Sequence, residues 1–316
     1  MNNIGWLYYR DYFDNDTLRD AHDINNCTLL KKQKEEKLNG IFRLKNQKIF
    51  NQILPNNPGN YIHNNKRLFN LKIENNGLVT GVGMGHETGY MGELKLGFTF
   101  DYTTGLPIIQ GFSVKGTLRS VFPNRLRLQA KNERDVTLKA KLLRKAVQKE
   151  KYCNAVFQQN EIILSKDQLF VFEWMVFEGS IPTKYIWNKE GIPIISEEKP
   201  ISIYESDVFH DAFISDSDRT PKKFLGNDFI TPHKNFKTQD KAYDALVDPT
   251  PLQFMKILPD VIFSFQFDLK ESIIDKNLSI SIETKLEIFK EILLDQGIGA
   301  KTNVGYGQFK EATTPA

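Results

Sequence analysis

The feature that most limits the possible folds is VIFSFQFDL, residues 261–269, in which apolar and polar side chains alternate from Phe263 to Leu269. Successive side chains of a β-strand point to opposite faces, so this pattern predicts a strand with one buried face. The same period of two recurs at 69–74 and at 94–100. The apolar positions are Phe69, Leu71 and Ile73, then Leu94, Leu96, Phe98 and Phe100, and finally Val261, Phe263, Phe265, Phe267 and Leu269.

Two amphipathic helices are predicted among these strands. Ser113 is predicted to cap the first helix, which ends before Pro123. Thr284 and Glu287 form a capping-box pattern for the second, which ends at Gly297. The apolar faces are Val114, Leu118, Val121 and Phe122 in the first helix, and Leu286, Phe289 and Leu293 in the second. Interleaved strands and helices predict an α+β fold.

The domain organisation follows from shifts in composition. The chain has 316 residues, 40% of them hydrophobic and 23 of them Phe, which is enough for a large core. Residues 1–67 are polar, rich in Asn and Lys and helix-like around TLLKKQKEEKLNGIFRL, and are predicted to be an N-terminal extension packed on the core. Residues 68–316 are predicted to be the main domain, with insertions at about 125–200. Within these, NERDVTLKAKLLRKAVQKEK is predicted to be an inserted basic surface helix.

Cysteine usage and hydropathy favour a cytoplasmic protein. Cys27 and Cys153 are isolated thiols without metal-ligand spacing, and the first residues lack the layout of a signal peptide. No apolar run approaches the roughly 20 residues that cross a bilayer. We therefore expect a reducing compartment and no membrane contact.

Two glycine-rich segments, GVGMGHETG at 81–89 and GIGAKTNVGYGQF at 297–309, invite a nucleotide-binding interpretation. A P-loop requires glycines at the positions that Asp295 and Ala300 occupy, and it follows a strand, whereas this segment follows a predicted helix. In the first segment, the last glycine of a dinucleotide fingerprint falls on His86. Neither segment is therefore predicted to bind a nucleotide cofactor.

Candidates for catalysis and metal binding are scattered. His86 with Glu87 suits a general base and its partner, and His233 suits a metal site with Asp207, Asp211 and Asp228. The carboxylates lie in segments that read as irregular, where Asp commonly caps turns, so structural roles are favoured. No nucleophile motif is present. We predict no catalytic set, no metal and no cofactor, and hence a protein that is not an enzyme.

Basic residues are more informative. Lys115 and Arg119 lie four residues apart on one predicted helix, and further cations follow directly. The second glycine-rich segment adds a lysine and an aromatic ring. Bare backbone amides, cations and a ring suit a phosphodiester strand with its bases. The predicted RNA-binding residues are Lys115, Arg119, Arg125, Arg127, Gly297, Gly299, Lys301, Thr302, Asn303 and Tyr306.

The segments LGFTFDYTTGLPIIQGFSVKGTLRS, GVGMGHETG and GIGAKTNVGYGQF resemble the signature of the RAMP (repeat-associated mysterious protein) superfamily of type III CRISPR effector complexes. Within it, DVFHDAFI, NDFITPH and DPTPLQFMKILPDVIFSFQF resemble the sixth subunit of the Cmr (type III-B) complex. The resemblance covers roughly residues 69–310 and preserves the order of the motifs. Gln110 and Phe112 depart from it, since the family's turn usually has Pro and Ser there.

The resemblance implies a ferredoxin-like, RRM-type core with inserted helices and loops. It also implies a non-catalytic, RNA-binding subunit that holds the 3′ region of the CRISPR RNA and the guide–target duplex. The implied partners are CRISPR RNA, target RNA and other RAMP subunits of a Cmr-type antiviral effector. Two alternatives stay open: a RAMP endoribonuclease that uses His86 or Asp228, and a protein scaffold without RNA contact.

Overall fold

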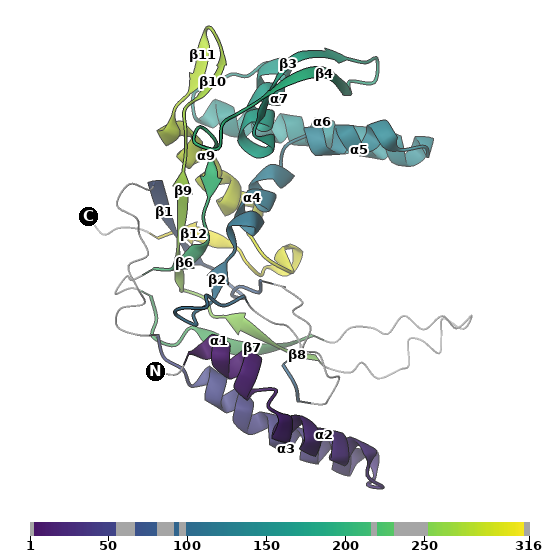
Figure 1. The fold of residues 1–316 in the computed structure, drawn as a ribbon, viewed down its shortest axis with the longest axis vertical. Helices are drawn as coiled ribbons and strands as arrows, with labels where there is room; N and C mark the ends of the chain where they lie inside the picture. The colour runs from purple at the N-terminus through teal and green to yellow at the C-terminus, as the bar shows by residue number, and fades with distance from the viewer. Residues whose placement is uncertain are drawn as a thin grey trace.

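The computed structural model of this protein describes residues 3–54, 67–80, 92–94, 99–215, 220–230 and 252–312 (Figure 1). Its helices are α1 (Ile4–Trp6), η1 (Leu7–Asp11), α2 (Asn15–Asn26), α3 (Lys31–Phe50), α4 (Gly111–Ser120), α5 (Asn124–Asn132), α6 (Val136–Gln159), α7 (Lys166–Glu173), η2 (Trp174–Glu178), α9 (Ile282–Gln296) and η3 (Thr302–Val304). Its strands are β1 (Arg67–Ile73), β2 (Ile108–Ile109), β3 (Ser180–Trp187), β4 (Pro193–Pro200), β5 (Val208–Phe209), β6 (Ala212–Ile214), β7 (Leu225–Ile230), β8 (Leu252–Ile257), β9 (Ile262–Asp268), β10 (Ser272–Asp275), β11 (Leu278–Ile280) and β12 (Phe309–Glu311).

The central sheet has the strand order β12-β1-β9-β6-β2, with β5 also paired to β9, and every pairing is antiparallel. In Figure 1, β9 forms the long central strand of this sheet. The strands predicted from the alternation around residues 69 and 261 are therefore confirmed. Phe263 and Phe265 are fully buried, but Ser264 and Gln266 on the opposite face are only 4% and 2% exposed. The expected half-buried strand is thus covered on both faces, and the Ser264 hydroxyl is satisfied by Asn70 Oδ1 at 2.5 Å.

The strand predicted at 94–100 is not found in the described part of that segment. Leu94 is buried, and its N–H donates to the hydroxyl of Tyr12 at 3.0 Å. Phe100 forms a single bridge with Pro107. Residues 95–98 lie outside the described residues. Conversely, the segments around Val208 and Leu225 that the sequence indicated to be irregular form the short strands β5, β6 and β7.

Helices α4 and α9 contact each other, and α9 packs on β1 and β12. Both predicted helices are confirmed, and Gly297 ends α9 with φ +65°. Their starts differ from the prediction. Helix α4 begins at Gly111 after Gln110, and Ser281, whose hydroxyl accepts from Thr284 N–H at 3.2 Å, caps α9.

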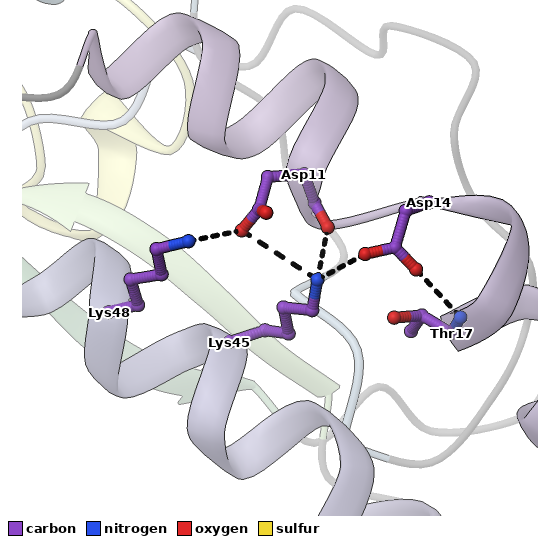
Figure 2. Close-up of polar contacts among 5 residues, drawn as sticks. All are labelled: Asp11, Asp14, Thr17, Lys45 and Lys48. Carbon is purple, nitrogen blue, oxygen red and sulfur yellow. Dashed lines mark hydrogen bonds and ion pairs between the residues drawn. The ribbon is translucent and has the colours of Figure 1, made fainter.

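The N-terminal segment consists of helices in its described part and packs beside the sheet hairpin β7–β8 (Figure 1). Figure 2 shows how α3 is tied to the chain before α2. Lys48 Nζ lies 2.9 Å from Asp11 Oδ2, and Lys45 Nζ lies 2.5 Å from Asp14 Oδ2. Partial burial alone raises the pKa of Asp14, but hydrogen bonds from Lys45 and Thr17 outweigh it and lower that pKa to about 2. The boundary between residues 1–67 and 68–316 stays a prediction.

The predicted basic surface helix is confirmed as α6, which extends to Gln159. Helices α5 and α6 pack together and project from the core as an arm (Figure 1). A β3–β4 hairpin, which was not predicted, lies next to this arm through α5. Across the described ranges, no helix is long and apolar enough to cross a membrane.

Candidate nucleic-acid interface

The C-terminal glycine-rich loop folds back on the chain's own backbone. Ala300 N–H donates to Val79 O at 2.7 Å, and Gly307 N–H donates to Gly77 O at 2.8 Å. A Cβ atom on Gly299 would lie 2.4 Å from Val79 O, and the residue has φ +97°, which favours glycine. Gly297 also has to be glycine, because a Cβ there would lie 2.4 Å from Gly307 O. The close approach that these glycines permit is therefore internal, whereas the sequence interpretation assigned it to RNA.

Tyr306 is a packing residue at the base of this loop. Its side chain is 8% exposed, and its ring lies edge-on to Phe254 with centroids 5.8 Å apart. Its hydroxyl donates to Asp228 Oδ2 at 2.8 Å, which Lys256 Nζ also approaches at 2.7 Å. Burial and the neighbouring Asp228 raise the pKa of Tyr306 to about 12. The sequence allows this ring either to stack on a base or to pack in the fold, and these contacts favour packing; Tyr306 as an RNA contact stays a prediction.

Asp228 is held as a structural carboxylate. Partial burial raises its pKa, but hydrogen bonds from Lys256, Phe229 N–H and Tyr306 outweigh this effect, so the pKa is lowered. A carboxylate that stays ionised and accepts three hydrogen bonds is poorly suited to donate a proton.

The tip of the glycine-rich loop keeps polar groups accessible. Lys301 adopts φ +62° and is half-buried, and its Nζ lies 5.9 Å from the ring centroid of Phe254. In the portion of the chain that is described, it forms no ion pair. Thr302 is half-buried and Asn303 is exposed, both in η3. These three residues stay predictions as RNA contacts.

The predicted cations of α4 and α5 differ in their exposure and in the contacts that they already make. Lys115 is half-buried, with Nζ 5.6 Å from the ring centroid of Phe209, and Arg119 forms an ion pair with Glu178. Arg125, the second residue of α5, is exposed. Arg125 is thus the most accessible of these three cations.

The structure corrects the prediction that Arg127 contacts RNA. It is 4% exposed, forms an ion pair with Glu150 and lies over the ring of Trp187 with Cζ 5.1 Å from the centroid. A buried guanidinium with these partners stabilises α5 against α6 and the β3–β4 hairpin, so it does not present charge to a polyanion.

The structure brings the start of α4 and the glycine-rich loop together. A small cavity of about 30 Å³ is lined from α4 by Gln110 and Ser113 and from the loop by Ile298 and Gly299. Gln110 Oε1 is buried there without a hydrogen-bond partner. The same holds for two further lining oxygens, Thr80 Oγ1 and Thr99 Oγ1. Two segments almost 190 residues apart in the sequence thus border one small cavity.

The carboxylates considered for a metal site have structural partners. Asp207 Oδ2 pairs with Lys285 Nζ at 2.7 Å, and Asp211 Oδ1 accepts from Gly111 N–H at 2.7 Å. These contacts agree with the favoured structural roles, and the absence of a metal site stays a prediction. Among the residues that the structure describes, no group of three or more His, Cys, Asp or Glu is placed to hold a metal ion. His86, Glu87 and His233 lie outside the described residues.

The sequence interpretation missed two lysines. Lys145 and Lys149 lie four residues apart on α6, and Lys149 donates a hydrogen bond to Ser120 O at the end of α4. Their i, i+4 spacing is visible in the sequence and predicts a shared face. The sequence did not indicate which element that face meets.

The described geometry thus comprises an antiparallel sheet, two helices packed together, and a glycine-rich loop set against the first of these helices. The chain belongs to the RAMP superfamily, whose family model matches residues 78–310. This confirms the resemblance drawn from the sequence motifs.

The chain also matches chains of solved structures. A chain in the cryo-EM structure of the Type III-B Cmr-beta bound to cognate target RNA matches with a TM-score of 0.49 and 18% identity, over 98% of this chain and 84% of that chain. The crystal structure of Cmr6 from Pyrococcus furiosus matches with a TM-score of 0.35 and 18% identity, over 78% of this chain and 98% of that chain. A chain of a Csm–crRNA–target RNA ternary complex from a type III-A system matches with a TM-score of 0.21 and 12% identity, over 56% of this chain and 40% of that chain. No curated protein matches the sequence.

Proposed function

We propose that this chain is a non-catalytic RNA-binding subunit of a type III-B (Cmr) RNA-guided antiviral effector complex. It would hold the 3′ region of the CRISPR RNA and the guide–target duplex beside other RAMP subunits. The observation that carries this proposal is the family match over residues 78–310, together with the Cmr-like motifs within it. A cytoplasmic location stays a prediction.

The proposal includes a ferredoxin-like, RRM-type core. Strands β1, β6, β9 and β12 occur in the sheet in the order β12-β1-β9-β6, with α4 between β1 and β6 and α9 between β9 and β12. This is the βαββαβ connectivity of ferredoxin-like folds. The short strand β2 and the helical arm are additions to it.

In this function, the protein reads the RNA backbone and base pairing supplies the sequence specificity. Lys115, Arg125 and Lys301 are the proposed phosphate contacts, because no carboxylate pairs with them in the portion of the structure that is described. Arg119 contributes less, since Glu178 already neutralises its charge.

The alternative, a RAMP endoribonuclease, predicts cleavage by the subunit itself. We expect the pure chain, incubated with labelled RNA with and without divalent metal, to leave the RNA intact. We also expect Asp228→Asn to leave target cleavage by the assembled complex within about twofold of wild type, because Asp228 already has structural partners. Loss of cleavage with assembly and RNA binding unchanged would establish a catalytic role.

Co-purification tests the proposed function directly. A tagged chain expressed in a cell with a type III-B locus is expected to retain sister RAMP subunits and short CRISPR RNAs, and crosslinks from this chain should map to the 3′ half of those RNAs. Recovery of sister subunits with no crosslinked RNA would favour the protein scaffold instead.

A further inference from the structure

Positive charge is concentrated in the helical arm. Residues 124–151 contain ten Lys and Arg against three Asp and Glu, a net charge of +7, whereas the whole chain carries only +3. The remainder of the protein is therefore net negative. A field of this kind attracts a polyanion to one region of an otherwise weakly charged molecule.

A groove of about 430 Å³ lies where this arm meets the core. It is lined by Lys145, Gln148, Lys149 and Tyr152 of α6, by Ser120 and Val121 at the end of α4, and by Gln296 at the end of α9. We call this the arm groove. Its α6 side chains are spaced as one helix face, so they point into it together.

The chemistry of the arm groove is that of hydrogen-bond donors. Lys145 and Lys149 provide ammonium groups, and Gln148 and Gln296 provide amide N–H groups. Two carboxylates lie next to lining residues in the sequence: Glu150 pairs with Arg127, and Asp295 accepts from the Tyr152 hydroxyl at 2.8 Å. In the described ranges, Lys145, Lys149 and the neighbouring Arg125 form no ion pair.

Lys149 is partly buried and lies near two other cations. Burial is the largest cause that lowers its pKa, Glu173 and then Cys153 oppose this, and the positive charges of Arg125 and Lys145 add smaller lowering effects. Lys149 also donates to Ser120 O at the C-terminus of α4, so it has a structural role. Arg125 and Lys145 are exposed and form no comparable contact with the residues that the structure describes. An anion in the groove would relieve the repulsion among the three.

An exposed face of α4 lies between the glycine-rich loop and the arm groove. Phe112 and Gly116 are exposed on the face that leads to Ser120, and a Cβ on Gly116 would meet nothing within 4 Å. The start of α4 borders the cavity beside the glycine-rich loop, and its end borders the arm groove. An RNA strand that crosses α4 from the side of the glycine-rich loop therefore reaches the arm groove.

Given the proposed function, we propose that the arm groove binds the phosphodiester backbone of RNA, with Lys145 of its lining and the exposed Arg125 at the start of α5 as phosphate contacts. A protein partner is less favoured, because protein interfaces have an apolar or aromatic core, whereas the one ring in this groove is tied to Asp295. Phosphate contacts require donors and positive charge, which this groove offers.

The test compares R125A/K145A with K32A/K37A, which removes the same charge from exposed positions on α3, at the opposite end of the molecule from α6 (Figure 1). Binding of a fluorescein-labelled 20-nucleotide oligouridine to the full-length chain is measured from low to physiological salt. Two lost contacts should flatten the slope of log affinity against log salt by about 1.4 and weaken binding about tenfold at physiological salt. The control should match wild type, and both variants should unfold within about 2 °C of it.

Each other outcome is informative. If wild type binds RNA and both double variants lose affinity and slope equally, the arm groove is not a phosphate site, and the proposed function stands. If R125A/K145A binds RNA as wild type does, the assignment is wrong, and failure of that variant to join its sister subunits would then identify the groove as a protein contact. If wild type binds no RNA, alone or in the complex, the groove assignment and the proposed function are both wrong.

Discussion

At the scale of single residues, Arg125 and Arg127 show what local sequence does not reveal. Both are arginines, and both are predicted to bind RNA. On a helix, residues two apart point to nearly opposite sides, so α5 exposes Arg125 and buries Arg127 against Glu150 and Trp187. Glu150 and Trp187 come from α6 and β3, and their proximity depends on the tertiary fold.

Glu173 is a buried carboxylate that the sequence did not single out. It is 3% exposed, and its two oxygens accept from Asn124 N–H at 3.3 and 3.2 Å. Burial raises its pKa to about 8, although Asn124, Arg119 and Arg127 oppose the shift. Arg119 Nε and Asn124 Nδ2 are buried nearby without hydrogen-bond partners.

Glu173→Gln should change how stability depends on pH. The folded-state pKa of about 8 lies above the ordinary value of 4.5, so the folded protein binds more protons between these values and loses stability as pH rises through them. Gln keeps an acceptor for Asn124 and removes the buried charge. Above pH 8, we expect the variant to be more stable than wild type by at least about 1 kcal/mol, with little difference near pH 4.5.

Thermal unfolding at pH 5, 7 and 8.5 measures this, with Glu36→Gln as an exposed control on α3. Wild-type and Glu173→Gln melting temperatures that differ by the same amount at all three pH values would show that Glu173 is not protonated in the fold.

Lys301 is the residue of the glycine-rich loop that best separates phosphate contact from solvated charge. It forms no ion pair among the described residues, so its charge is available. In the assembled complex, Lys301→Ala should weaken RNA binding equally for all guide sequences and flatten the salt slope by about 0.7. Lys276→Ala, on the exposed β10–β11 turn, is the matched control. Affinity and slope at wild-type values would remove Lys301 from the interface.

At the scale of elements, the sequence predicts best where the signals are local. Gly297 ends α9 as expected, because a positive φ at a helix end is a local requirement. The start of α4 was missed, because Gln110 makes no side-chain cap and Gly111 N–H is satisfied by Asp211, 100 residues away. Strands as short as β5 and β6 show too few residues for a period of two to be recognised.

Two glycines on neighbouring elements should respond oppositely to alanine. Gly299→Ala places a Cβ 2.4 Å from Val79 O at φ +97°, and backbone strain of this kind costs about 1–3 kcal/mol before the clash is counted. Gly116→Ala on α4 meets no atom within 4 Å and should stabilise the protein by up to about 1 kcal/mol. Thermal or urea unfolding of both variants measures this. A neutral Gly299→Ala would show that the loop is not seated on residues 77–79.

At the scale of the whole molecule, a net charge of +3 conceals a basic arm on a mildly acidic remainder. The sequence located the basic stretch but gave no indication that it meets the end of α4. The approach of Gln110 to Gly299 across one cavity likewise depends on the complete sheet. The sequence motifs indicated that these segments belong together through their resemblance to a family, and the structure shows the contact.

The four cations proposed as phosphate contacts predict how the isolated subunit should behave. Four contacts, from Lys115, Arg125, Lys145 and Lys301, correspond to a salt slope of about 2.8 for single-stranded RNA. Such a subunit should bind guide RNA weakly at physiological salt. In the complex, linked neighbouring subunits raise the effective concentration, so the same RNA should bind 10²–10⁴ times more tightly and with a steeper slope. Binding of one labelled guide RNA to both preparations, over the same salt range, measures the difference. Equal affinity and equal slope would mean that this chain binds RNA autonomously and does not depend on its place in an assembly.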